Sequence, residues 1–158
     1  MTKEFVPVND VIDMIQDWDG VRLNWDEYFI SIAYLTASRS SCKRLNVGCV
    51  IVDNNRIVAT GYNGHIAGAP HTSIVRDEHE QATIHAEQNA IADAAKRGIG
   101  LNGTTAYVTH FPCITCFKLM VQSGIHVIKY MTDYKNDPLI QSLIQSSGVK
   151  LIKIEVPN

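Results

Sequence analysis

Helical and strand-like stretches alternate along most of this sequence. β-branched runs bounded by turn residues predict strands, and apolar residues three and four positions apart predict helices. The predicted strands are 47–52, 56–62, 105–109, 125–131 and 149–156, and the predicted helices are 26–37, 84–97, 112–123 and 139–146. Segment 65–81 shows neither pattern and is expected to be a loop. This order predicts an α/β fold, a three-layer α-β-α sandwich around a five-stranded mixed sheet whose last two strands are parallel.

The length of 158 residues is typical of one domain. Residues 1–24 are acidic and weakly patterned, although Val11 to Ile15 can form a short helical face before Gly20 ends it. We therefore expect residues 1–24 to be an N-terminal appendage and residues 25–158 to form a single domain.

Composition narrows the class of protein. Hydrophobic residues make up 46% and charged residues 19% of the chain, as in ordinary globular proteins, and the net charge is −2. This balance argues against a nucleic-acid partner or an anionic membrane surface. Apolar runs such as 47–52 are too short to span a bilayer, and residues 1–7 lack a signal-peptide pattern. We therefore expect a cytoplasmic protein with a small-molecule ligand.

Two short motifs carry metal chemistry. His85-Ala86-Glu87 lies at the start of one predicted helix, and Pro112-Cys113-Ile114-Thr115-Cys116 starts the next. Cysteines three positions apart share a helix face, and a helix N-terminus favours their thiolate forms. Two thiolates and one imidazole would leave the fourth position of a tetrahedral zinc ion open for water. The motifs predict a catalytic zinc site with Glu87 as its base.

Other interpretations of these motifs need weighing. A Cys-x-x-Cys pair in a cytosolic protein can also be a redox pair or half of a structural zinc site. A structural site closes its shell with a fourth protein ligand and does not need a carboxylate two residues from its histidine. The presence of Glu87 therefore favours catalysis.

His-x-Glu followed by Pro-Cys-x-x-Cys is the signature of zinc deaminases that act on nucleobases. From residue 25 to residue 156 the chain resembles the deoxycytidylate (dCMP) deaminases of the cytidine/deoxycytidylate deaminase superfamily. The resemblance is carried by Tyr28-Phe29, Arg39-Ser40-Ser41-Cys42, Val47-Gly48, Gly61-Tyr62-Asn63-Gly64, residues 85–91, Tyr107-Val108-Thr109, Ser123-Gly124-Ile125, Tyr130 and Tyr134. It implies a cytidine deaminase-like fold.

The resemblance also implies a reaction, in which water on zinc attacks C4 of cytosine and ammonia leaves, so that dCMP becomes dUMP for thymidylate synthesis. It assigns zinc to His85, Cys113 and Cys116 and the proton shuttle to Glu87. Substrate contacts are implied for the backbone of Ala86 at the pyrimidine, Asn63 at the sugar, and Arg39, Lys43 and Tyr134 at the 5′-phosphate. Arg39 and Lys43 are equally explained as solvated surface charges, and Tyr134 as a packing residue.

Many relatives bind a second, structural zinc near the loop after the hairpin. Cys42, His71 and His79 could contribute ligands here, but Thr72 stands where a cysteine is expected. Loop histidines are more often ordinary polar residues, so we expect one zinc ion per chain.

Enzymes like this are typically homohexamers that are activated by dCTP with magnesium and inhibited by dTTP. The turn Gly61-Tyr62-Asn63-Gly64 is similar to the nucleotide-effector region of the family, where glycines permit close approach to a ligand. The resemblance therefore implies an effector site at this turn.

Several alternatives stay open. A free cytidine deaminase joins its last two strands directly, whereas residues 139–146 predict a crossover helix here. A guanine deaminase or a tRNA adenosine deaminase belongs to the same superfamily, but a tRNA enzyme should have a basic face. A zinc-binding interaction module without activity is the alternative from a different class of protein.

Overall fold

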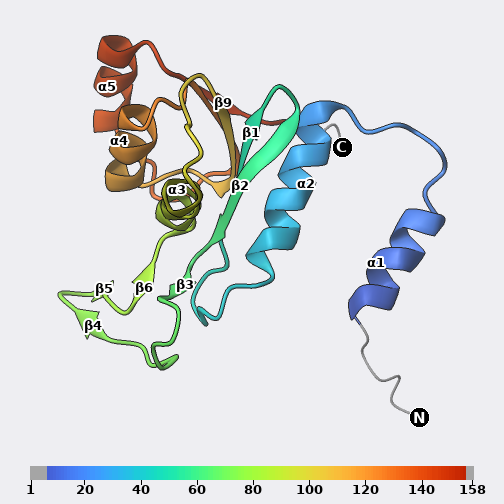
Figure 1. The fold of residues 1–158 in the computed structure, drawn as a ribbon, viewed down its shortest axis with the longest axis horizontal. Coiled ribbons are helices and arrows are strands. Elements are labelled where there is room, and N and C mark those ends of the chain that lie inside the picture. Colours follow the sequence, from blue (N-terminus) through green and yellow to red (C-terminus); the bar gives the residue numbers. More distant parts are fainter. Residues whose placement is uncertain (1–6, 156–158) are drawn as a thin grey trace.

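The structure is a computed structural model that describes residues 7–155 (Figure 1). A five-stranded sheet in the order β2-β1-β7-β8-β9 forms its centre. The strands are β1 (Gly48–Asp53), β2 (Arg56–Tyr62), β7 (Thr105–His110), β8 (Val127–Thr132) and β9 (Lys150–Lys153). β1 is antiparallel to β2 and β7, whereas β7, β8 and β9 are mutually parallel. The predicted mixed sheet and its parallel last strands are thereby confirmed.

Helices cover both faces of the sheet. The helices are α2 (Trp25–Ala37), α3 (Ala86–Arg97), α4 (Ile114–Gln122) and α5 (Leu139–Ser147). α2 lies on one face, and α3, α4 and α5 lie on the other (Figure 1). The side chains of β1 alternate between two cores, with Cys49 and Ile51 facing α3 and Val50 and Val52 facing α2. This is the predicted three-layer α-β-α sandwich.

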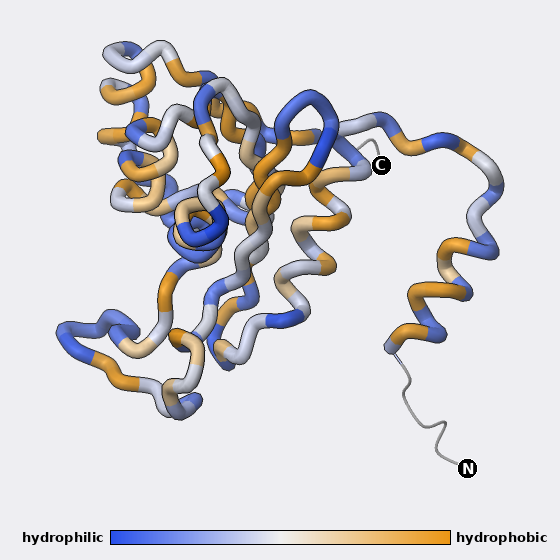
Figure 2. The backbone as a smooth tube through the Cα atoms, viewed as in Figure 1, coloured by the Kyte–Doolittle hydropathy of each residue, from blue (hydrophilic) through white to orange (hydrophobic). Residues whose placement is uncertain are grey.

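The segment 65–81, expected to be a loop, contains short strands. β3 (Gly64–His65) pairs with β6 (Thr83–Ile84), and β4 (Val75–Arg76) pairs with β5 (His79–Glu80). Asp77 and Glu78 adopt left-handed φ values of 49° and 63° in the β4–β5 turn, and this tip is hydrophilic (Figure 2). Two acidic residues occupy turn positions that usually carry glycine or asparagine, so this hairpin was not predicted from the residue pattern.

Some predicted boundaries were wrong. α3 begins at Ala86 instead of residue 84, because Ile84 pairs with Gly64 in a strand. α4 begins at Ile114 instead of residue 112, and Cys113 caps it. β8 begins two residues later than predicted, and β9 ends at Lys153. The predicted last strand extended to residue 156, which lies outside the described residues.

The N-terminal helix α1 (Pro7–Gln16) confirms the predicted helical pattern but contains no buried residue. It stands apart from the sandwich (Figure 1). Within residues 7–155, no helix has the length and apolar character needed to cross a membrane.

Candidate active site

The starts of two helices form the candidate site. His85 is the N-cap residue of α3, and its backbone N–H donates a hydrogen bond to the side-chain carbonyl of Gln88 at 3.0 Å. Cys113 is the N-cap residue of α4, and its Sγ accepts a hydrogen bond from the Cys116 N–H at 3.4 Å. Both residues have extended backbone conformations, so each side chain projects in front of its helix.

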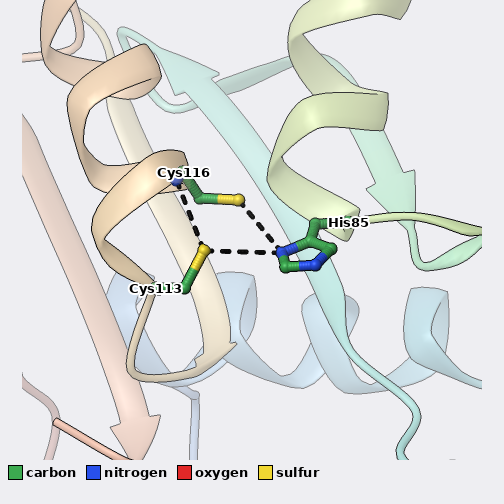
Figure 3. A group of neighbouring side chains, drawn as sticks. All are labelled: His85, Cys113 and Cys116. Atoms are coloured by element: carbon green, nitrogen blue, oxygen red, sulfur yellow. Dashed lines mark hydrogen bonds between the residues drawn. The ribbon is translucent and has the colours of Figure 1, made fainter. Parts of the chain in front are cut away.

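Three metal-binding side chains meet at this point (Figure 3). The Nδ1 atom of His85 lies 3.5 Å from Cys113 Sγ and 3.3 Å from Cys116 Sγ. Cys116 is fully buried, whereas His85 and Cys113 are open to solvent. Within residues 7–155, no other group of three or more such side chains is close enough to share a metal ion.

The electrostatics of the site favour one thiolate before metal binds. A hydrogen bond with the Cys116 thiol, together with one from His85, lowers the pKa of Cys113 to about 4. The same hydrogen bond with Cys113, and burial, raise the pKa of Cys116. The hydrogen bond to Cys113 also raises the pKa of His85. Metal binding must therefore displace a proton from Cys116, since thiolates are the ligands.

The donor set fits zinc. A tetrahedral zinc ion with bonds of about 2.0 Å to nitrogen and about 2.3 Å to sulfur holds such atoms about 3.5 Å apart. The two nitrogen–sulfur distances of 3.5 and 3.3 Å agree with this geometry. A site with three protein ligands has room for one further ligand, as in catalytic zinc sites.

Glu87 lies beside this group on the first turn of α3. Among residues 7–155 it is the only buried charged side chain, with 4% of its surface exposed, and its carboxyl group lies next to the Cys116 thiol. Burial raises the pKa of Glu87, because the protein interior disfavours the charged form. A carboxyl group in this environment is suited to accepting and returning a proton.

Asn63, expected at the substrate sugar, makes two side-chain hydrogen bonds to the backbone. Its Oδ1 accepts from the Val47 N–H at 2.8 Å, and its Nδ2 donates to the Leu45 carbonyl at 2.7 Å. The amide therefore anchors the segment before β1. One N–H and one lone pair of Asn63 remain for another partner.

The three residues expected at the phosphate lie on the surface. The Arg39 guanidinium is 5.8 Å from the centre of the Tyr62 ring, and Lys43 is exposed. The Tyr134 ring is packed edge-to-face against His110, with 6.1 Å between ring centres. Arg39 and Tyr134 therefore each pack against a ring, Tyr62 and His110 respectively. Ala86, which is expected at the pyrimidine, is buried at the start of α3.

The turn of residues 61–64 is shaped by packing. A side chain at Gly61 would meet the backbone of α3, because its Cβ would lie 2.2 Å from the Ala86 oxygen and 2.4 Å from the Ala90 nitrogen. Glycine at this position therefore lets β2 approach α3. Tyr62 contributes its carbonyl oxygen to a hydrogen bond from Asn89 Nδ2 at 2.9 Å.

The residues considered for a second metal do not converge among the described residues. The ring of His71 stacks on His65 with 5.0 Å between centres, and His65 Nδ1 lies 3.1 Å from Ser41 Oγ. Cys42 and His79 do not join them in a metal-binding group.

No site role was predicted from the sequence for two residues next to the site, although Thr109 lies in one of the motifs that carry the resemblance. Thr109 and His110 end β7, immediately before the cysteine motif, and their side chains are 2.7 Å apart. A polar pair at the carboxyl end of a parallel strand is a recognised signal for a site, and it could have drawn attention to them.

A family model described as the cytidine and deoxycytidylate deaminase zinc-binding region matches residues 23–132. The chain is 43% identical over 139 residues to ComE operon protein 2 of Bacillus subtilis, covering 85% of this chain and 74% of that protein. It is 37% identical over 142 residues to deoxycytidylate deaminase of Schizosaccharomyces pombe, covering 82% of this chain. The chain spans less than half of that yeast relative, 44% of its length.

A solved structure of similar fold is the dCMP deaminase of cyanophage S-TIM5 in complex with dCMP and dUMP. It has a TM-score of 0.72 and 34% sequence identity, and the match covers 81% of this chain and 95% of that one. The zinc-binding region identified by the family model contains the two helix starts that bring the imidazole and both thiols together. The chain therefore belongs to the cytidine and deoxycytidylate deaminases, a family of zinc-binding enzymes.

Proposed function

We propose that this protein catalyses the hydrolytic deamination of dCMP to dUMP and ammonia. The observation that carries the proposal is the buried carboxyl group of Glu87 beside a group of one imidazole and two thiols. The names of its relatives, including a phage enzyme bound to dCMP and dUMP, support dCMP as the substrate. The catalytic unit in this proposal is residues 25–158, with residues 1–24 as an appendage.

In this proposal His85, Cys113 and Cys116 hold the zinc ion. When bound, zinc supplies Lewis-acid chemistry that makes a water molecule a stronger nucleophile at neutral pH. The N-terminus of α4 stabilises the negative charge of the two thiolates through its backbone N–H groups.

Glu87 moves the protons of the reaction. Its carboxylate takes a proton from the attacking water and returns it to the pyrimidine at N3, and a second transfer lets the C4 amino group leave as ammonia. Burial raises the pKa of Glu87 toward the working pH, so the carboxyl group can both accept and return a proton.

The proposed substrate contacts run from the pyrimidine through the sugar to the 5′-phosphate. The backbone of Ala86 contacts the pyrimidine, and the remaining N–H or lone pair of Asn63 contacts the sugar. Arg39, Lys43 and Tyr134 supply donors for the 5′-phosphate, and their exposure leaves them accessible to a ligand.

We also propose that the protein forms a homohexamer regulated by dCTP, with Mg²⁺, as activator and by dTTP as inhibitor. The effector would bind at the turn Gly61-Tyr62-Asn63-Gly64. Asn89 links this turn to α3, so a ligand that favours one arrangement of the turn can bias the active site. The product dUMP would feed thymidylate synthesis. None of the four cysteines, which all lie within residues 7–155, forms a disulfide, and this suits a cytoplasmic location.

A substrate panel tests the proposed activity. We expect a much larger specificity constant, kcat/KM, for dCMP than for deoxycytidine or cytosine, because binding energy from a positioned phosphate orients C4 over the site. Guanine and a tRNA carrying the target adenosine serve as substrates for the alternative deaminases. Equal specificity constants for dCMP and deoxycytidine would instead indicate a nucleoside deaminase, and inert zinc-loaded protein would indicate a binding module.

A separate experiment tests regulation and assembly. Light scattering gives the mass of the particle with and without dCTP and dTTP, and rate curves against dCMP show cooperativity. A monomer with a hyperbolic rate curve, unchanged by either triphosphate, would contradict the regulatory proposal and leave the proposed chemistry intact.

A further inference from the structure

His110 lies next to the candidate site and has no part in the mechanism described so far. It is the last residue of β7, three positions before Cys113, and its side chain is partly exposed. One side of its ring contacts the Thr109 hydroxyl group, with 2.7 Å between Nδ1 and Oγ1. Its ring also meets the Tyr134 ring at an angle of 81°.

The buried neighbour of His110 selects its tautomer. Thr109 is completely buried, and its Oγ1 accepts a hydrogen bond from the Gly48 N–H at 3.2 Å. The hydroxyl proton of Thr109 needs an acceptor, and His110 Nδ1 is the acceptor within reach in the described part of the chain. Nδ1 therefore accepts, and the ring proton is on Nε2. Burial lowers the pKa of His110, which keeps the ring in this neutral form.

The Nε2–H group is directed away from Thr109, on the partly exposed side of the ring. It makes no protein hydrogen bond among residues 7–155, and it is not an occluded atom. A fixed N–H donor open to solvent is suited to an anionic oxygen.

Tyr134 is held on the same edge of the sheet. The Phe111 N–H donates to the Thr132 carbonyl at 2.8 Å, which ties the end of β7 to the end of β8. The Tyr134 N–H donates to Asn136 Oδ1 at 2.9 Å, so the loop that carries the ring is braced. Lys135 Nζ lies 5.4 Å from the centre of the Tyr134 ring and adds a positive charge.

We propose that His110 is a specificity residue whose Nε2–H donates a hydrogen bond to the 5′-phosphate of the nucleotide, beside the Tyr134 hydroxyl. Thr109 is a positioning residue for this contact, since it orients the ring from the buried side. The inference rests on the proposed function and extends it, because it names a neutral donor that separates nucleotides from nucleosides.

Two substitutions of His110 separate the donor from the ring. His110→Asn keeps an acceptor near Thr109 but has no atom at the position of Nε2, whereas His110→Gln extends an N–H group to that position. Hydrogen bonds to charged groups correspond to factors of about 10 to 100 in affinity. We expect His110→Asn to lower kcat/KM for dCMP by that factor and to leave kcat/KM for deoxycytidine nearly unchanged. His110→Gln should recover most of the loss.

Binding provides a readout without turnover. Calorimetry should show that His110→Asn binds dUMP about 10- to 100-fold more weakly than the unsubstituted protein does. Deoxyuridine should bind equally to His110→Asn and to the unsubstituted protein. His126→Asn is the matched control, because His126 is exposed and precedes β8, at the opposite end of that strand from Tyr134. Zinc content and the urea unfolding midpoint should be unchanged in all three variants.

The outcomes distinguish this inference from the proposed function. If His110→Asn loses activity equally on dCMP and deoxycytidine, or His110→Gln fails to recover dUMP binding, the phosphate contact is wrong although dCMP deamination stands. If the unsubstituted protein does not prefer dCMP to deoxycytidine, the proposed function itself fails.

Discussion

His85 Nδ1 lies 3.3 Å from Cys116 Sγ, although the two residues are 31 positions apart in the sequence. The intervening chain runs down α3, returns along β7 and enters α4, so the two helix starts meet at the carboxyl end of β7. Ligands at the beginnings of two packed helices have their backbone held by the helices themselves. The site is therefore built on rigid elements of the sandwich, and its geometry does not depend on a long loop.

Replacing Glu87 should separate catalysis from metal binding. We expect Glu87→Gln to keep zinc and fold but to lower kcat about 10²- to 10⁴-fold, because the amide preserves shape without carrying the proton. Zinc analysis and rates on the same samples provide the measurement. Glu78→Gln makes the same chemical change in the exposed β4–β5 turn and should leave zinc content and kcat unchanged. Near-normal turnover by Glu87→Gln would refute the assigned role.

The three ligand-type residues should be required for zinc. We expect Cys113→Ser and His85→Ala to lose the metal, because each removes one of three donors at the site. Cys42→Ser removes a cysteine that lies outside this group and serves as the control. Metal analysis after dialysis should give about one zinc per chain for the control. Stoichiometric zinc in both ligand variants would require a different donor set.

Gly61→Ala should displace α3. The added Cβ would overlap backbone atoms at 2.2 and 2.4 Å, which cannot rotate away. Overpacking of this kind costs about 1–3 kcal/mol of unfolding free energy, and the shift of the His85–Glu87 segment should reduce kcat/KM. Urea unfolding and steady-state rates measure the two effects. Gly100→Ala is the control, since no atom lies within 4 Å of its added Cβ. If Gly61→Ala is as stable as the unsubstituted protein, α3 can shift to accommodate the added Cβ without cost.

Asp26 should contribute stability that depends on pH. Burial raises its pKa, but hydrogen bonds from Lys129 at 2.7 and 2.9 Å and from the Tyr107 hydroxyl outweigh burial and lower it below the ordinary 3.8. A lowered pKa in the folded state stabilises the fold above pH 3.8 and loses this effect as pH falls through the folded value. Because the Asp26 side chain is 39% exposed, we expect only about 1 kcal/mol.

Urea unfolding of Asp26→Asn should therefore show a deficit at pH 7 that shrinks as the solution is acidified below pH 3.8. Asp53→Asn is the control, because Asp53 is exposed and forms no ion pair in the described part of the chain. A deficit that stays constant down to the acid transition would mean that packing, and not the charge of Asp26, is responsible.

The sequence pattern located most elements, and its errors have physical causes. Uninterrupted β-branched and apolar runs predicted β1 and β7, and the runs are uninterrupted because the side chains of these strands face two different cores. Ile84 fits a helical pattern equally well, and only its pairing with Gly64 places it in a strand. The β4–β5 turn depends on left-handed Asp77 and Glu78, a conformation that local sequence preference disfavours.

At the site too, some contacts follow from sequence spacing and others only from the packing of whole elements. Cys113 and Cys116 lie on one helical turn, so their sequence spacing alone determined that the two thiols are neighbours. The approach of His85 was decided by the packing of α3 against α4, and the contact of His110 with Tyr134 by the parallel alignment of β7 and β8. Local spacing determines contacts within one element because backbone geometry is regular there, whereas contacts between elements depend on how whole faces pack in three dimensions.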